Sequence, residues 1–147
     1  MTYTACIRTF AADEWRTYRD QRLRALADAP NAFTRTLAEE ESRPDAESSS
    51  RLRSGVDSGW NVPLLAEVDS APIGLVWGRI EAANPDIANL YQMWVAPKYR
   101  RLGVGRMLVE AVIAWARAAD VQYLDLGSRV IIVRRCAYIL RRVQTRG

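Results

Sequence analysis

A short glycine-containing stretch, Tyr99–Arg106, carries the clearest chemical signal in the sequence. One residue separates Gly103 from Gly105, and glycine lets backbone N–H groups approach a ligand with no Cβ in the way. A helical pattern of apolar residues begins directly after this turn. The first N–H groups of a helix lack internal partners and lie at the positive end of its dipole. We therefore expect the turn to bind an anion such as a pyrophosphate.

Three arginines add positive charge at the rim of this turn: Arg100, Arg101 and Arg106. A plain tight turn with solvated arginines would contain the same residues, since short glycine motifs recur by chance. The elements on either side favour the anion site, because a strand before the turn and a helix after it would hold its backbone in place.

The elements around the turn form a β-α-β unit. Residues Leu90–Val95 predict a strand that Pro97 ends, and residues Gly103–Ala118 predict a helix with apolar side chains at three- and four-residue steps. Residues Val121–Leu126 predict a second strand. A unit of this size is sufficient to join two parallel strands through a right-handed crossover.

The other elements follow from alternation, caps and turns, and we assign Trp60, Trp77 and Trp94 to the core. Together they predict an α/β fold for residues 1–147 as a single domain, with a mixed central sheet flanked by helices. The further predictions are a strand at Tyr3–Arg8, a helix capped by Asp13 and ending near Ala27, a short helix near Asp45–Arg53 within a polar loop, and a hairpin of Val62–Val68 and Pro72–Ile80 around Asp69-Ser70.

Composition excludes several classes of function. The chain contains no histidine, which excludes histidine-based catalysis and most zinc chemistry. Cys6 and Cys136 predict neither a disulfide framework nor a metal site. The sequence shows no signal peptide, and no apolar run reaches the roughly 18 residues that a membrane span needs. We therefore expect a cytoplasmic enzyme with no metal and no membrane partner.

The net charge of +4 comes from one end of the chain. Residues 128–147 contain six arginines and no acidic residue, whereas residues 1–127 hold 15 basic and 17 acidic side chains. A basic-tailed nucleic-acid-binding protein is therefore the weaker alternative. Tyr138 is the only aromatic residue of that tail, which leaves little for base stacking.

The stretch Arg100-x-x-Gly103-x-Gly105 resembles the Arg/Gln-x-x-Gly-x-Gly/Ala turn of the GNAT superfamily of N-acetyltransferases. In that family the turn lies between the fourth strand and the third helix. The preceding residues, Leu90–Pro97, are similar to the fourth strand with its Val-x-Pro exit. The resemblance extends over residues 3–127 and implies the GNAT fold, in which the parallel fourth and fifth strands splay apart around the cofactor.

The resemblance also implies an activity: transfer of an acetyl group from acetyl-CoA to a primary amine, of a small molecule or a peptide, by direct attack. The backbone of Met93 and Val95 would pair with the pantetheine amides, and the acetyl carbonyl would be polarised near Val95. The amides from Arg101 to Arg106 would hold the pyrophosphate. The cofactor-binding residues carried over are Met93, Trp94, Val95, Arg100, Arg101, Leu102, Gly103, Val104, Gly105 and Arg106.

The acetyl transfer that the resemblance implies also needs a catalytic base. Attack requires a neutral amine, so a base or a water path must remove a proton. Many family members place a glutamate near the start of the fourth strand, where this chain has Asn89. Glu81 is our candidate base and Asp86 a substitute, with a solvated surface carboxylate as the competing interpretation of each. The acidic run Glu39–Glu41 would attract a cationic amine or form a solvated turn.

The resemblance ends after Gly127, where the family pattern of a loop followed by Asn-x-x-Ala-x-x-Leu-Tyr is absent. Synonymous codons permit that pattern in a shifted reading frame, so we interpret residues 128–147 as frameshifted. Free choice of third bases is the competing explanation. The tail would form an amphipathic helix over the sheet or drive self-association as a homodimer. A catalytically impaired acyl-CoA-binding remnant is therefore an alternative function.

Overall fold

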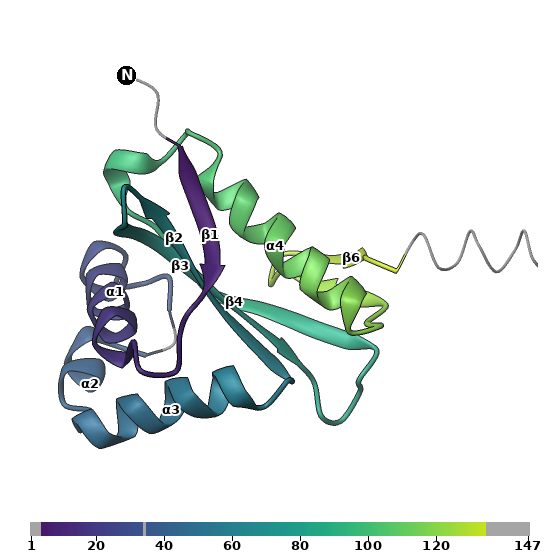
Figure 1. The fold of residues 1–147 in the computed structure, drawn as a ribbon, viewed down its shortest axis with the longest axis horizontal. Coiled ribbons are helices and arrows are strands. Elements are labelled where there is room, and N and C mark those ends of the chain that lie inside the picture. The colour runs from purple at the N-terminus through teal and green to yellow at the C-terminus, as the bar shows by residue number, and fades with distance from the viewer. Residues whose placement is uncertain (1–3, 34, 135–147) are drawn as a thin grey trace, which may run out of the picture.

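The computed structural model describes residues 4–33 and 35–134, and these form a mixed sheet of six strands with helices on both faces (Figure 1). The spatial order of the strands is β1-β2-β3-β4-β5-β6, the same as their order along the chain. The elements are β1 (Ala5–Thr9), α1 (Trp15–Asp28), α2 (Leu37–Glu41), α3 (Asp45–Asp57), β2 (Asn61–Val68), β3 (Ala71–Ile80), β4 (Ile87–Val95), the 3-10 helix η1 (Pro97–Tyr99), α4 (Val104–Ala118), β5 (Tyr123–Asp125) and β6 (Val130–Ile132).

Neighbouring strands pair antiparallel except at β4 and β5, which are parallel and are joined through α4. The parallel pair confirms the predicted β-α-β unit. The hairpin of β2 and β3 is also confirmed, with Asp69 and Ser70 at its turn. Both turn residues have positive φ angles, 50° and 65°. This combination matches the right-handed twist of the two strands.

Two clusters of buried side chains lie on opposite faces of the sheet. The predicted helix α4 packs Leu108, Val112 and Ala116 on one face, and each of these residues is fully buried. Phe10, Tyr18 and Leu52 fill the other face under α1 and α3. The sheet is thereby covered on both sides, as the α/β prediction requires.

Helix α1 begins one residue later than expected, and Asp13 does not cap it. Its N-cap position is Glu14, without a side-chain cap bond. The Glu14 carboxylate instead accepts from the Ala11 N–H at 2.8 Å and from the Arg8 guanidinium at 2.7 Å. The paired carboxylate and guanidinium fasten the start of α1 to strand β1, which replaces the missing cap.

The polar segment after α1 contains more helix than its sequence indicates. Helix α2 is capped by Thr36, whose hydroxyl accepts from the Glu39 N–H at 3.2 Å. Helix α3 extends to Asp57, beyond the predicted end at Arg53. Tertiary packing explains the extension, because a Cβ atom at Gly55 would lie only 2.4 Å from the Trp77 ring. Glycine therefore lets α3 lie directly on that ring.

The three tryptophans differ in burial. Trp77 and Trp94 are 4% and 5% exposed, which confirms their assignment to the core. The same assignment for Trp60 is wrong, since 47% of that residue is exposed. Trp60 precedes β2 directly, in the bend after α3, where neither buried cluster covers it.

The start of the tail is a strand and not the expected amphipathic helix. Gly127 has a φ angle of 90°, and residues 126–129 reverse the chain so that β6 pairs antiparallel with β5. Val133 then donates its N–H to the Gln122 carbonyl oxygen at 2.9 Å and is fully buried. The rest of the tail, including Tyr138, lies outside the described residues. Among the described helices, none is long and apolar enough to cross a membrane.

Candidate functional site

Strand β4 is irregular at the middle of the sheet. Trp77 lies opposite Tyr91 and Leu75 lies opposite Trp94, so β4 has one more residue than β3 between these pairs. Gln92 absorbs the extra residue with a φ angle of 59°. A bulge of this kind bends a strand and increases its local twist. The second half of β4 therefore runs in a different direction from the first half.

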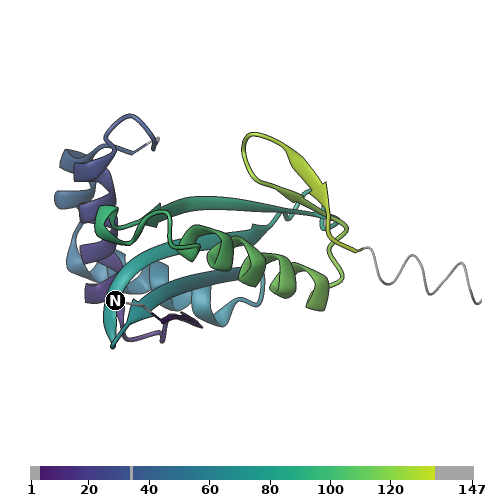
Figure 2. The ribbon, with the colours of Figure 1, turned by 90° about the horizontal axis from the view of Figure 1, so that it is seen from above.

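Strands β4 and β5 separate at the same place. Their parallel pairing ends at Asn89 and Asp125, although β4 continues to Val95. Figure 2 shows the hairpin of β5 and β6 diverging from β4. The expected splayed pair is thus present. Ala96 donates to the Ile73 carbonyl oxygen at 2.8 Å, so the alternation of the strand turns the polar groups of Val95 away from β3.

The glycine turn directly follows β4 and η1. Arg101 and Gly103 both have left-handed backbone conformations, with φ angles of 65° and 84°. Gly103 is the N-cap of α4, no side chain caps this end of the helix, and Met107 makes an early helical bond to the Gly103 carbonyl oxygen at 3.0 Å. The first N–H groups of α4 therefore have no partner within the helix, as an anion site requires.

A cavity of about 350 Å³ lies between this turn and the end of β4. Most of the predicted cofactor residues line it, and Leu102 and Arg106 do not. Leu102 is 53% exposed, and Arg106 pairs with Glu110 along the outer face of α4 at 3.0 Å. The lining residues are Ala29, Ala32, Phe33, Met93, Trp94, Val95, Tyr99, Arg100, Arg101, Gly103, Val104 and Gly105.

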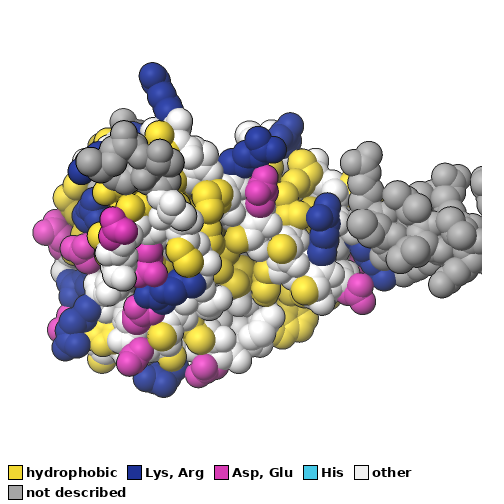
Figure 3. Space-filling model, turned by 45° about the horizontal axis from the view of Figure 1, so that its top comes forward, with side chains coloured by type: hydrophobic (Ala, Val, Ile, Leu, Met, Phe, Trp, Pro, Cys, Tyr) yellow, Lys and Arg dark blue, Asp and Glu magenta, His cyan; other side chains and the backbone are white. Residues whose placement is uncertain are grey.

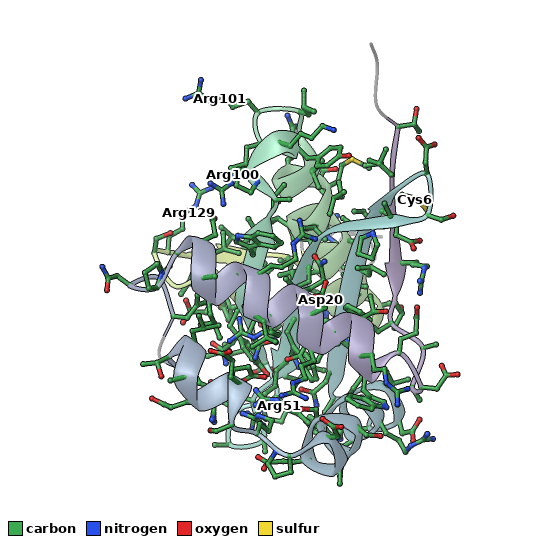
Figure 4. The ribbon with its side chains drawn as sticks, turned by 90° about the vertical axis from the view of Figure 1, so that its left-hand side faces the viewer. Cys6, Asp20, Arg51, Arg100, Arg101 and Arg129 are labelled. Atoms are coloured by element: carbon green, nitrogen blue, oxygen red, sulfur yellow. The ribbon has the colours of Figure 1, made fainter. Side chains whose placement is uncertain are left out.

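Arg100 differs in orientation from the rim position expected for it. Its Nε donates to the Val95 carbonyl oxygen at 2.9 Å, and its Nη2 pairs with the Asp28 carboxylate. The same carboxylate accepts from the Trp94 indole N–H at 2.9 Å. These two donors, Trp94 first and then Arg100, hold the pKa of Asp28 below its usual value. Arg100 therefore fastens the exit of β4 to α1, whereas Arg101 projects outward in Figure 4.

A second, larger cavity of about 550 Å³ lies beside the first. Ala32, Phe33 and Met93 line both, so the two cavities adjoin at the bulged part of β4. Figure 3 shows one face of the molecule, on which hydrophobic side chains are exposed between arginine or lysine side chains. The larger cavity is lined by Arg22, Ala32, Phe33, Arg35, Glu39, Arg51, Leu90, Tyr91, Gln92, Met93 and Leu126.

The structure does not bring Glu81 together with the predicted cofactor residues. Glu81 is exposed in the loop after β3, as is Asp86, and neither lines either cavity. Asn89 lies within β4, opposite Arg79 of β3 and Asp125 of β5. In the part of the chain that the structure describes, the Glu81 carboxylate therefore does not border the opening between β4 and β5.

The acidic run Glu39–Glu41 forms α2 and is not a uniformly solvated turn. Glu40 is buried and forms ion pairs with Arg43 at 3.5 Å and with Arg35 at 3.8 Å. Glu39 is exposed and, among the described residues that line the two cavities, is the only one with a carboxylate.

Sequence reasoning missed several residues that line the cavities. Phe33 and Ala32 lie in the segment after α1, and Arg22 and Arg51 lie on α1 and α3. The spacing of Arg22 could have identified it, since it stands four residues after the buried Tyr18 and four before the buried Leu26. An arginine on the apolar face of a helix is uncommon unless it has a partner.

A model of the Acetyltransferase (GNAT) family matches residues 12–131 of the chain. The chain therefore belongs to this family, and its mixed sheet with a parallel β4 and β5 is the family's fold. No sequence among the curated proteins matches it significantly.

Several solved structures share this fold at low sequence identity. An acetyltransferase of the GNAT family from Streptococcus pneumoniae is 18% identical with a TM-score of 0.68, over 82% of this chain and 72% of that chain. A predicted acetyltransferase from Clostridium acetobutylicum, solved with acetyl-CoA, is 13% identical with a TM-score of 0.64, over 82% and 79%. The aminoglycoside N-acetyltransferase AAC(6')-Iy, solved with CoA, is 16% identical with a TM-score of 0.64, over 85% and 77%.

Proposed function

We propose that this chain transfers an acetyl group from acetyl-CoA to a primary amine. The observation that carries the proposal is the pair of adjoining cavities, which meet at Met93 where β5 no longer pairs with β4. One cavity lies on the glycine turn and the other between β4 and the helical segment α1–α3. A donor in the first and an acceptor in the second would meet at the bulge. Direct attack, without a covalent enzyme intermediate, suits this arrangement.

The residues of the smaller cavity fit a CoA group. The uncapped start of α4 offers N–H donors to a pyrophosphate, from Arg101 to Arg106. The unpaired edge of β4 offers backbone groups to the pantetheine amides at Met93 and Val95. The Val95 carbonyl oxygen already accepts from Arg100, so we assign pantetheine binding there to the Val95 N–H. The group supplies an activated acyl thioester when bound.

The chain must also remove a proton from the acceptor amine, because only the neutral amine is nucleophilic. We propose Glu39 for this step, either directly or through a water molecule, since its carboxylate borders the larger cavity. This proposal competes with Glu81, which the sequence suggested and which lies in an exposed loop outside both cavities. A cytoplasmic location and the choice between a small-molecule and a peptide amine stay predictions of the sequence.

The first test is thermal unfolding of the chain with acetyl-CoA, CoA and ATP in parallel. A ligand at 100 times its dissociation constant adds about 2.7 kcal/mol to the free energy of unfolding. We expect acetyl-CoA and CoA to stabilise the protein, and Gly103→Asp and Gly105→Asp to abolish that stabilisation. A carboxylate at either position would stand against the bound pyrophosphate.

Gly59→Asp is the matched control. Gly59 and Gly103 both have positive φ angles, 73° and 84°, and a Cβ atom at either would meet nothing within 4 Å. The two substitutions therefore carry similar backbone strain, but Gly59 lines neither cavity. Equal loss of the CoA response in both variants, or no response in the unsubstituted protein, would contradict the proposed site. Release of CoA thiol in the presence of amines then separates an enzyme from an acyl-CoA-binding remnant. The tail leads us to expect turnover below about 1 per second.

A further inference from the structure

The larger cavity contains a buried cation without a full set of partners. Arg22 projects from α1, and only 4% of the residue is exposed. Its Nη1 atom is buried and has no hydrogen-bond partner among the described residues. Buried guanidinium N–H groups are nearly always paired, because an unpaired one loses its hydration without compensation. The same residue lines the cavity, so its positive charge acts on a ligand bound there.

Two more cations line the same cavity. Arg35 follows α1, and Arg51 projects from α3 on the other side. Burial lowers the pKa of Arg22, and the charges of Arg51 and Arg35 add to that effect, against the opposing Tyr18 and Glu40. Three arginines that repel one another in one cavity need a negative charge between them.

The acidic residues nearby supply only part of that charge, chiefly through Glu40. Glu40 is engaged by Arg43 and Arg35, at 3.5 Å and 3.8 Å, and does not line the cavity. Glu39 is the only acidic residue of the lining as far as the structure describes the chain, and its carboxylate already accepts from the Thr36 hydroxyl at 3.1 Å. The lining therefore carries a net positive charge at neutral pH.

The cationic group also has a defined position relative to the smaller cavity. The Arg22 guanidinium carbon lies 5.0 Å from the centre of the Phe33 ring, and Phe33 lines both cavities. Figure 4 shows Arg51 at the opposite end of that view from Arg100 and Arg101. The larger cavity thus has its own cationic group, separate from the arginines of the glycine turn.

From these contacts we propose that the acceptor is an amine that also carries an anionic group, a carboxylate or a phosphate, and that Arg22 and Arg51 bind this group. The proposal rests on the proposed acetyl transfer and names its substrate class. Arginine is well suited to such anions because its planar N–H groups bind two oxygens at once. Binding of the anion at Arg22 leaves the amine free to reach the junction of the cavities at Met93.

This substrate class differs from that of a structural neighbour. Aminoglycosides carry several amino groups and are polycations at neutral pH, so three arginines would repel them. The shared fold therefore does not extend to a shared acceptor, and we expect aminoglycosides to be poor ligands here.

The test is a binding screen of the full chain with CoA present, read by thermal unfolding. The ligands are the twenty standard amino acids with their amides, O-phosphoethanolamine with ethanolamine, and neamine as a polycation. We expect at least one amine with an anionic group to bind about tenfold more tightly than its counterpart without that group, which is the effect of one lost charged hydrogen bond. Carboxylate and phosphate ligands form separate arms of the screen. The proposal is overturned if the counterparts without an anionic group or neamine bind as tightly as the anionic amines, or if no anionic amine binds.

Two pairs of variants assign the effect to the arginines. Arg51→Gln should weaken binding of the anionic amine about tenfold while leaving binding of the counterpart without the anionic group unchanged, whereas Arg53→Gln should change neither. Arg53 is exposed on the same helix and lines neither cavity. Arg22→Gln should act more strongly than Arg51→Gln, with exposed Arg16→Gln on α1 as its control. Arg51→Gln without effect on a bound anionic amine would contradict the assignment.

The outcome is separable from that of the proposed function. Binding of acetyl-CoA is measured on its own with the glycine variants, and acetyl transfer is measured by thiol release. Acetyl transfer only to amines without an anionic group would uphold the acetyltransferase and overturn the anionic acceptor. Binding of anionic amines with no response to acetyl-CoA would overturn the acetyl transfer and leave only an anion-binding site at Arg22 and Arg51.

Discussion

The Tyr18 hydroxyl group donates a hydrogen bond to the side-chain oxygen of Gln92 at 2.6 Å. Tyr18 is 2% exposed within α1, and Gln92 is the residue with positive φ at the bulge of β4. The bond therefore ties the helix above the larger cavity to the irregular position in the strand below it. Burial raises the pKa of Tyr18, which keeps its hydroxyl protonated and able to donate.

Tyr18→Phe tests this bond. The substitution keeps the ring contacts with Phe10 and Trp77 and removes only the hydroxyl. We expect the free energy of unfolding in urea to fall by about 1 kcal/mol, since the Gln92 oxygen loses its partner. Tyr123→Phe is the control, because Tyr123 is 39% exposed on β5. Equal changes in the two variants would show that the bond contributes nothing specific.

Glu39→Gln and Glu81→Gln separate the two candidate bases. Glutamine keeps the size of the side chain and its place in the cap formed with Thr36, so α2 should stay folded. We expect Glu39→Gln to lower kcat/KM about a hundredfold, the lower range for loss of a general base, and Glu81→Gln to leave it unchanged. Thiol release at saturating acetyl-CoA measures both. A loss confined to Glu81→Gln would return the role to Glu81.

The ion pair of Arg8 with Glu14 makes the free energy of unfolding depend on pH under acidic conditions. Hydrogen bonds from Arg8 hold the pKa of Glu14 at about 2, below the ordinary value of 4.5. A lowered pKa stabilises the fold above pH 4.5, and this contribution is lost as the pH falls toward 2. The Glu14 side chain is 25% exposed, and solvent screening therefore limits the effect to about 1 kcal/mol.

Urea unfolding of the wild type and of Glu14→Gln checks this dependence. The variant should be less stable by about 1 kcal/mol near pH 7 and equally stable near pH 2. Asp13→Asn is the control, because Asp13 is exposed beside Glu14 and caps no helix. A difference that persists at the acidic end would assign the effect to packing and not to the ion pair.

Genomic DNA across codons 120–147 tests the interpretation of the tail. We expect the family's Asn-x-x-Ala-x-x-Leu-Tyr pattern to be encoded in another frame downstream of Gly127. The structure shows that the first part of the tail is folded. Strand β6 and buried Val133 pack against β5 and α4. A DNA sequence with no family pattern in any frame would contradict the shift.

Most of the fold could be predicted from the sequence because the strongest sequence signals were local. Alternation, the turn at Asp69 and Ser70, and the apolar stripe of α4 predicted their elements within a few residues. The position of the smaller cavity could be predicted from the turn Arg100 to Gly105 for the same reason. Glycines at this spacing indicate a backbone conformation that depends only on neighbouring residues.

Features set by distant contacts could not be predicted. Helix α3 continues through Gly55 because Trp77 lies under it, and no local pattern encodes that contact. The direction of Arg100 depends on Asp28, which is 72 residues earlier in the chain. The bulge at Gln92 requires a register with β3 that alternation alone does not define. The larger cavity joins side chains from α1, residues 32–39, α3, β4 and the residue after β5, so its charge could be seen only after folding.

The end of the β4–β5 pairing at Asn89 has a consequence for handling the protein. From Leu90 to Val95 one edge of β4 lies inside the sheet without a strand beside it from residues 4–33 or 35–134. An unpaired edge can accept a strand from a neighbouring molecule, and covering it removes that route to aggregation. We expect ligand-free preparations to lose solubility with time and concentration, and added CoA to act as a preservative as much as a reactant.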